Sequence, residues 1–63
     1  MSESLSLDER IRKYRKLAIR AFHLARQASD KNLRAGYFTM AAAWHSLAAD
    51  AERARGRLAA THH

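Results

Sequence analysis

The chain contains no cysteine and no proline, and only two of its 63 residues are glycine. The absence of cysteine excludes disulfide bonds and thiolate metal sites. Because proline breaks helices and glycine weakens them, their scarcity favours a chain that is helical over nearly its whole length. A domain of about 60 residues buries only about 60% of its unfolded surface, so it is marginally stable alone. We therefore expect part of its stability to come from oligomerisation.

Long apolar runs are also missing. The longest stretch without a formal charge covers residues 35–49, and these fifteen residues are fewer than the roughly 20 that span a bilayer. Glu3, Asp8 and Glu9 precede the first apolar run, which is unlike a signal peptide. These features predict a soluble, cytoplasmic protein without a membrane span.

Two apolar stripes with alternating steps of four and three residues are the clearest pattern in the chain. The first stripe consists of Leu7, Ile11, Tyr14, Ala18, Ala21, Ala25 and Ala28. The second stripe consists of Leu33, Tyr37, Met40, Trp44, Leu47, Ala51, Ala54 and Leu58. This spacing lines one face of an α-helix and is typical of helix–helix packing. Because the step from Ala28 to Leu33 is five, the sequence predicts an all-α, antiparallel two-helix hairpin that assembles into a four-helix bundle.

The expected boundaries follow from residues that cap or weaken helices. Ser6, with Glu9 three residues later, is typical of the capping box that starts a helix. Asp30 is the expected N-cap of the second helix, with Ser29 as the alternative. Gly56 weakens this helix, which ends there or frays beyond it. The predicted single domain, residues 1–63, consists of helix 1 at about 7–29, a turn at 29–32, helix 2 at about 31–56 and a flexible tail at 57–63.

Folding the chain about the turn predicts which side chains meet across the hairpin. Ala18 is expected opposite Trp44, and Tyr14 opposite Leu47, so a large side chain faces a small one at most levels. Such alternation suits a closely packed helix pair without voids. The sequence therefore places Trp44 in the core.

The second helix is also apolar on the side away from its stripe. A helix that is apolar nearly all round is buried nearly all round, so this helix needs a partner beyond the first one. The predicted self-association residues are Ala35, Phe38, Ala42 and Ala49. The pattern favours a small non-enzymatic structural or interaction protein that acts as a homodimer or homotetramer through helix packing. A heterologous partner, or an alanine-rich face without a partner, remains open as an alternative.

Positive charge is concentrated on the outer face of the first helix. The chain has 12 lysine and arginine residues against six aspartate and glutamate residues, which gives a net charge of +6. The predicted polyanion-binding residues are Arg12, Lys13, Lys16, Arg20 and Arg26. The alternative function is an accessory protein that binds nucleic acid or another polyanion weakly and non-specifically, because phosphate contact needs only basic side chains. The simpler interpretation is a solvated face whose long side chains cover apolar surface.

No set of residues has the spacing of a catalytic, cofactor or metal site. His23 and His45 lie on different predicted helices, and neither has a carboxylate or a second histidine three or four residues further along. No serine or threonine has an evident partner base. We therefore expect no enzymatic activity, no cofactor, no metal ion and no small-molecule substrate.

One further pattern runs through about residues 12–54. It consists of Tyr14-x-x-Leu17-Ala18, Leu24-Ala25, Ala28-Ser29-Asp30, Leu33-Arg34-Ala35-x-Tyr37, Ala41, Trp44, Leu47-Ala48 and Ala51-Glu52. In this pattern the chain resembles a group of short uncharacterised proteins, typical of alphaproteobacteria, that are expected to form α-helical hairpins. The group commonly has proline after the turn aspartate, where this chain has Lys31. The resemblance implies a hairpin fold and a bacterial origin, and it implies no particular activity.

Overall fold

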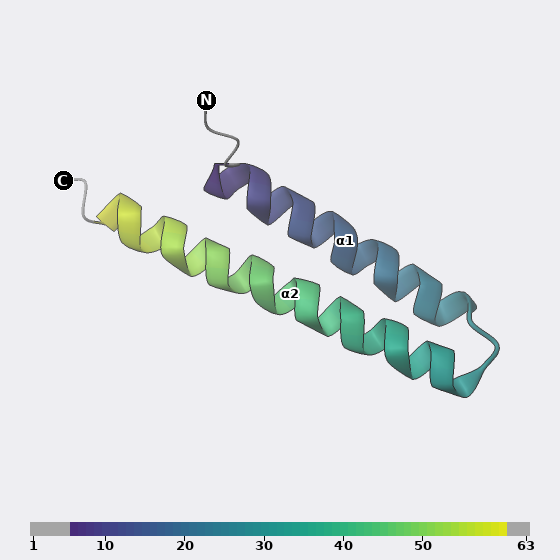
Figure 1. The fold of residues 1–63 in the computed structure, drawn as a ribbon. Helices are drawn as coiled ribbons and strands as arrows, with labels where there is room; N and C mark the ends of the chain where they lie inside the picture. The colour runs from purple at the N-terminus through teal and green to yellow at the C-terminus, as the bar shows by residue number, and fades with distance from the viewer. Residues whose placement is uncertain (1–5, 61–63) are drawn as a thin grey trace, which may run out of the picture.

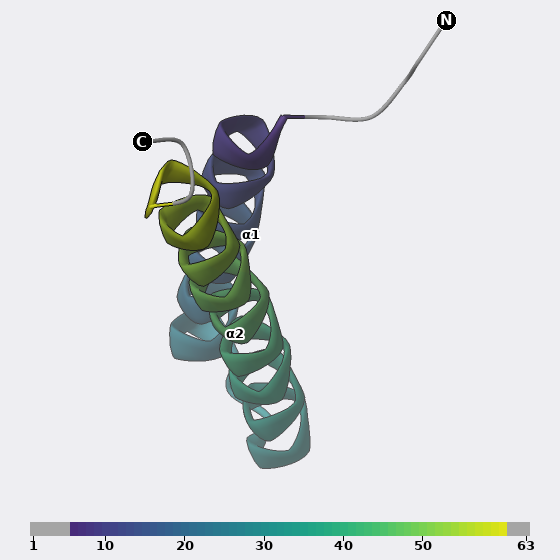
Figure 2. The ribbon, with the colours of Figure 1, turned by 90° about the vertical axis from the view of Figure 1, so that its left-hand side faces the viewer.

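Two antiparallel α-helices joined by a short turn make up the computed structural model, which describes residues 6–60 (Figure 1). Helix α1 covers Leu7–Gln27 and helix α2 covers Lys31–Ala60. The all-α hairpin predicted from the two stripes is therefore confirmed. The molecule is a single layer of two helices, 50 Å long and 12 Å in its thinnest dimension (Figure 2). Within the described residues each helix has one helical neighbour, and both broad sides of the layer are open.

Helix α1 begins with the predicted capping box. The backbone N–H of Glu9 donates to Ser6 Oγ at 3.2 Å, and the backbone N–H of Ser6 donates to Glu9 Oε1 at 2.9 Å. The Ser6 backbone N–H lowers the pKa of the Glu9 carboxyl most, and the Ser6 hydroxyl and the charge of Arg12 lower it further. All three favour the charged carboxylate. That charge also complements the positive end of the helix dipole.

A three-residue turn separates the helices. Ala28 is extended, with φ −71° and ψ 127°, and ends α1 at Gln27 rather than near residue 29. Asp30 caps α2 as predicted, since its Oδ2 accepts a hydrogen bond from the backbone N–H of Leu33 at 3.0 Å. The Arg34 guanidinium donates to the Ala28 carbonyl oxygen from Nε at 3.3 Å and from Nη2 at 3.0 Å. These bonds link α2 back to the end of α1 and hold the turn closed.

The C-terminal end of α2 differs from the prediction. The sequence predicts an end at Gly56, but the helix continues to Ala60. One glycine costs about 1 kcal/mol relative to alanine, which is too little to stop a helix between strong helix formers such as Arg55, Arg57 and Leu58. Residues 57–60 are therefore helical rather than part of a tail. The rest of the predicted tail, residues 61–63, lies outside the described residues.

Alanine dominates the contact between the helices. The buried side chains among the described residues are Ile11, Ala21, Ala25, Ala41, Ala48 and Ala51. The distance between two packed helices depends on the side chains at the contact, and a single methyl group allows a close approach. The core of this hairpin is therefore a narrow seam, and the larger apolar side chains lie beside it.

Trp44 and Tyr14 meet across the hairpin, a contact that the sequence did not predict. Their rings stack on each other, with centroids 5.9 Å apart and an interplanar angle of 22°. Both rings are half-buried, and Leu47 is 41% exposed. The prediction that Trp44 lies in the core is therefore wrong. The stacked pair is thus a contact between α1 and α2 that the solvent still reaches, and the fully buried positions are taken by smaller side chains.

Candidate self-association surfaces

The residues next to the seam alanines define two sides of the hairpin. Successive side chains in an α-helix are rotated by about 100°. The residue that follows a seam alanine therefore lies on one side of the layer, and the residue that precedes it lies on the other. Phe22 follows Ala21 on α1, and Ala42 follows Ala41 on α2, and both line the same hollow. The two helices thus present their following residues on one shared side.

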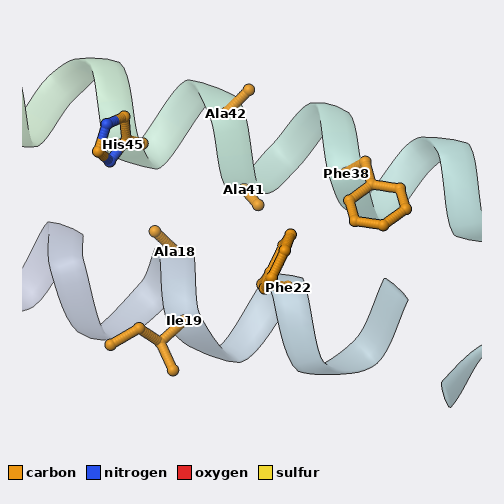
Figure 3. A pocket seen from close by; sticks show the side chains of 7 residues that line it. All are labelled: Ala18, Ile19, Phe22, Phe38, Ala41, Ala42 and His45. Atoms are coloured by element: carbon orange, nitrogen blue, oxygen red, sulfur yellow. The ribbon is translucent and has the colours of Figure 1, made fainter. Parts of the chain in front are cut away.

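We call this shared side the aromatic side, and it consists of Ile19, Phe22, Phe38, Ala42 and His45. With Ala18 and Ala41 these residues line an open hollow of about 380 Å³ (Figure 3). Phe22 and Phe38 meet edge to face, with centroids 5.5 Å apart and an interplanar angle of 62°, which is a favourable geometry for two rings. Ile19 is nevertheless 60% exposed. The aromatic side is apolar, and part of its surface is already covered by its own ring pair.

The opposite side, which we call the leucine side, consists of Leu17, Leu24, Leu33, Met40 and Leu47. Each of these residues except Leu33 directly precedes an alanine of the contact, and Leu33 lies seven residues before Met40. Their spacing of seven within each helix aligns them in one row per helix. Four of them are between 39% and 53% exposed. The leucine side is therefore an aliphatic surface made by both helices, with no ring contact of its own to cover it.

The four residues predicted for self-association do not share one environment. Phe38 and Ala42 line the hollow of the aromatic side, whereas Ala49 is half-buried outside it and Ala35 is exposed. Phe22 contacts the ring of Phe38. An isolated hairpin therefore exposes only part of Phe38, although the sequence places this residue on a face away from the first helix.

Sequence reasoning missed the leucine side because it assigned Met40 and Leu47 to the interior of the hairpin. A signal for their true position is present in the sequence. Each is followed directly by an alanine, Ala41 or Ala48, which takes the seam position instead. Where a small and a large apolar residue are adjacent, the smaller one allows the closer helix contact.

The residues predicted to bind a polyanion are all exposed, and none of them forms an ion pair with another residue of the described range. They are Arg12, Lys13, Lys16, Arg20 and Arg26. The first three surround a shallow depression together with Glu9. Arg26 directly follows Ala25, so it lies toward the aromatic side rather than on the outer face. The structure therefore brings Arg12, Lys13 and Lys16 together at this depression, whereas Arg20 and Arg26 do not line it.

The acidic side chains that cross the hairpin pair with other cations. Arg55 Nη1 contacts Asp8 Oδ1 at 2.6 Å, and Arg15 pairs with Glu52. Exposed pairs of this kind contribute only about 0–1 kcal/mol each. They join α1 to α2 toward the end opposite the turn, and they leave the outer cations of α1 without these two carboxylates as counter-charges.

Residues 6–60 show no arrangement suited to bound-metal chemistry. Within that range no three histidine, cysteine, aspartate or glutamate side chains are grouped to hold a metal ion, and no polar or charged side chain is buried. His45 lies at the hollow of the aromatic side, and His23 is exposed on α1. Neither helix of the described chain is long and apolar enough to cross a bilayer.

Comparison with known proteins adds nothing to this description, because no family model, no curated protein and no solved structure matches the chain. The resemblance to alphaproteobacterial hairpin proteins stays a prediction. The features of residues 6–60 that could bind a partner are the two apolar sides and the cations of α1.

Proposed function

We propose that this hairpin is a non-enzymatic interaction protein that works as a homo-oligomer, in which the apolar sides of the hairpin pack against other copies. The observation that carries the proposal is the mismatch between core and surface. The buried core is alanine with one isoleucine, while eight large apolar side chains of the described residues are at least 39% exposed.

The position of the large apolar side chains matters energetically. Fully burying a leucine, isoleucine or phenylalanine side chain contributes about 1.5–3 kcal/mol, whereas a methyl or methylene group contributes about 0.8 kcal/mol. The single hairpin therefore leaves a large part of the surface of its bulkiest apolar side chains exposed. Packing two hairpins against each other would bury it and produce the four-helix bundle that the repeat pattern predicts.

Sedimentation velocity over a range of micromolar concentrations tests the proposal. We expect a folded species of at least twice the 7.2 kDa mass of the chain, with helix content that falls on dilution together with the mass. A species that is monomeric at the highest concentration and still unfolds cooperatively would refute the proposal.

A second candidate function is the binding of a polyanion by the outer cations of α1. The observation that favours it is that Arg12, Lys13 and Lys16 are exposed close together without ion-pair partners among the described residues. Binding to phosphates would be non-specific, because no aromatic side chain stands among these cations to stack on a base.

Fluorescence anisotropy with a labelled DNA duplex tests this second function. Affinity should fall linearly on a log–log plot against salt, with a slope near −0.9 for each neutralised phosphate. The double variant Lys16→Glu with Arg20→Glu should abolish binding without changing the oligomer mass. Absence of binding by the native chain at about 50 mM salt would rule it out.

A further inference from the structure

We infer that the second copy packs on the leucine side, with α1 of each copy beside α2 of the other and both turns at the same end of the bundle. This inference rests on the proposed self-association and specifies its surface and its symmetry. It leaves the aromatic side on the outside of the dimer.

The stripe on α2 gives the first argument. Its residues form one continuous row with steps of four and three, but only some of them meet α1. Tyr37 and Trp44 are half-buried against α1, whereas Leu33, Met40 and Leu47 from the same row are 41–53% exposed. A row that continues beyond one helix contact indicates a second helix neighbour on that side, as in a four-helix bundle. The leucine side is thus continuous with the contact already present.

The two sides differ in how far their apolar side chains already cover one another. On the aromatic side Phe22 and Phe38 cover part of each other, and a hollow rather than a ridge lies between the helices. On the leucine side Leu17 and Leu24 from α1 extend the aliphatic row of α2. Aliphatic side chains projecting from two helices can interdigitate with an identical surface, as a two-fold symmetric interface requires.

Charge selects between the two ways of pairing the leucine sides. In both arrangements every neighbouring pair of helices is antiparallel, so helix dipoles do not distinguish them. Helix α1 carries seven basic and two acidic residues, whereas residues 35–49 of α2 carry no formal charge. Placing α1 beside α1 would bring Lys13 and Arg20 of the two copies together. Placing α1 beside α2 sets these cations against the uncharged stretch, so repulsion between like charges is lower.

Matched variants on the two sides test which surface pairs. Met40→Glu places a charge on the leucine side, where Met40 is 48% exposed in the single hairpin, and Ile19→Glu places one on the aromatic side, where Ile19 is 60% exposed. By sedimentation, Met40→Glu should weaken self-association at least about 100-fold, since a buried unpaired charge is strongly unfavourable. Ile19→Glu should leave the dissociation constant within about threefold. The reverse pattern would overturn the leucine-side assignment while leaving self-association standing.

A milder pair of variants keeps the test decisive if Met40→Glu fails to fold. Met40→Ala introduces no charge and a stronger helix former, and it should weaken self-association about tenfold, or about 1.4 kcal/mol. Ile19→Ala is its control and should have no effect. Equal effects of the two alanine variants would contradict the assignment. A monomeric native chain would instead refute the proposed function itself.

Spin labels at Ser29→Cys test the orientation, because Ser29 is exposed in the turn and makes no hydrogen bond with the described residues. If both turns lie at one end, neighbouring or diagonal helices separate the labels, and the distance should be under about 25 Å. If the turns lie at opposite ends, the 21 residues of α1 separate them by about 31 Å along the axis. A distance above about 30 Å in the native-like dimer would overturn the orientation.

Discussion

Helices α1 and α2 are built for different surroundings. Helix α1 has a capping box at its start and seven cations distributed over the surface outside its apolar residues. Helix α2 has fifteen consecutive residues without a formal charge, and its apolar row is wider than its contact with α1. The difference means that α2 offers a longer uncharged surface to a second helix neighbour, whereas α1 keeps a larger part of its surface charged and exposed to solvent.

The comparison also explains why the seam is made of alanine. Helix α1 contributes Ala21 and Ala25 and helix α2 contributes Ala41 and Ala48 to the buried contact. With small side chains at the centre, both helices direct their large side chains sideways, out of the single layer. A second layer can then bury them. In the proposed dimer, the alanine contact within each hairpin and the contact between the copies would bury different sets of apolar side chains.

The largest expected loss of stability comes from removing the Trp44 ring, which joins α2 to α1. Trp44→Ala deletes the partner stacked on Tyr14. Truncating a tryptophan in a core costs about 3–5 kcal/mol, and because Trp44 is only half-buried we expect about 2–4 kcal/mol. Urea unfolding followed by circular dichroism, at fixed protein concentration, measures the loss. Tyr14→Phe, which keeps the ring, is the control, and a loss below about 1 kcal/mol for Trp44→Ala would contradict the stacked geometry.

Much of the hairpin could be predicted because its signals are local. The capping residues Ser6 and Asp30 and the break after Ala28 depend on a few neighbouring residues, and the structure confirms them. Which apolar residues of a helix face its neighbour depends on both helices, however. On α2 either the row with Met40 and Leu47 or the adjacent alanines Ala41 and Ala48 could face α1, and the structure buries the alanines.

The candidate surfaces were harder to predict for the same reason. A rotation of α2 by part of a turn moves Met40 from the core to an exposed side and brings Phe38 against Phe22. Periodicity alone cannot distinguish a row that faces one helix from a row shared between two. The cations of α1 were simpler to locate, since charged residues face solvent whichever partner the apolar face selects.

A test of the seam itself is expected to have the next largest effect. Ala25 is fully buried between the helices, so Ala25→Leu must push them apart. Overpacking of this kind costs about 1–3 kcal/mol. The matched variant Ala35→Leu adds the same atoms on an exposed part of α2 and should change stability by less than about 0.5 kcal/mol. If both leucines are tolerated equally in thermal unfolding, the helices do not meet through a close alanine seam.

Removing the capping box at the start of α1 should cause a smaller loss of stability, and this loss should depend on pH. Ser6→Ala should cost about 1 kcal/mol near neutral pH. The pKa of Glu9 lies below its ordinary value of 4.5 in the folded chain. The contribution of the Glu9 carboxylate to the free energy of unfolding is therefore complete above the pKa that Glu9 has in the unfolded chain. It is lost as the pH falls through the lower pKa of Glu9 in the folded chain.

The difference in stability between the native chain and Ser6→Ala should therefore decrease as the pH falls below 4.5, the ordinary pKa of a glutamate carboxyl. Asp8→Asn is a useful control, because Asp8 lies in the same helix turn but takes no part in the capping box. A difference that stays constant from pH 7 to pH 3 in thermal unfolding would show that the Ser6 hydroxyl does not favour the charged form of the Glu9 carboxyl.

The smallest expected effects on stability come from replacing the two glycines. Comparing them distinguishes the single hairpin from the proposed dimer. Gly36 and Gly56 both lie in α2, and a methyl group added at either would meet no atom within 4 Å in the single hairpin. Alanine should therefore stabilise the helix at each position by up to about 1 kcal/mol.

Gly36 directly precedes Tyr37 in the helix contact and so lies on the leucine side, whereas Gly56 follows Arg55 and lies on the aromatic side. If a second copy covers the leucine side, Gly36→Ala should gain less than Gly56→Ala in unfolding at high protein concentration, and the two gains should converge on dilution. Equal gains at every concentration would mean that nothing packs against α2 beside Gly36.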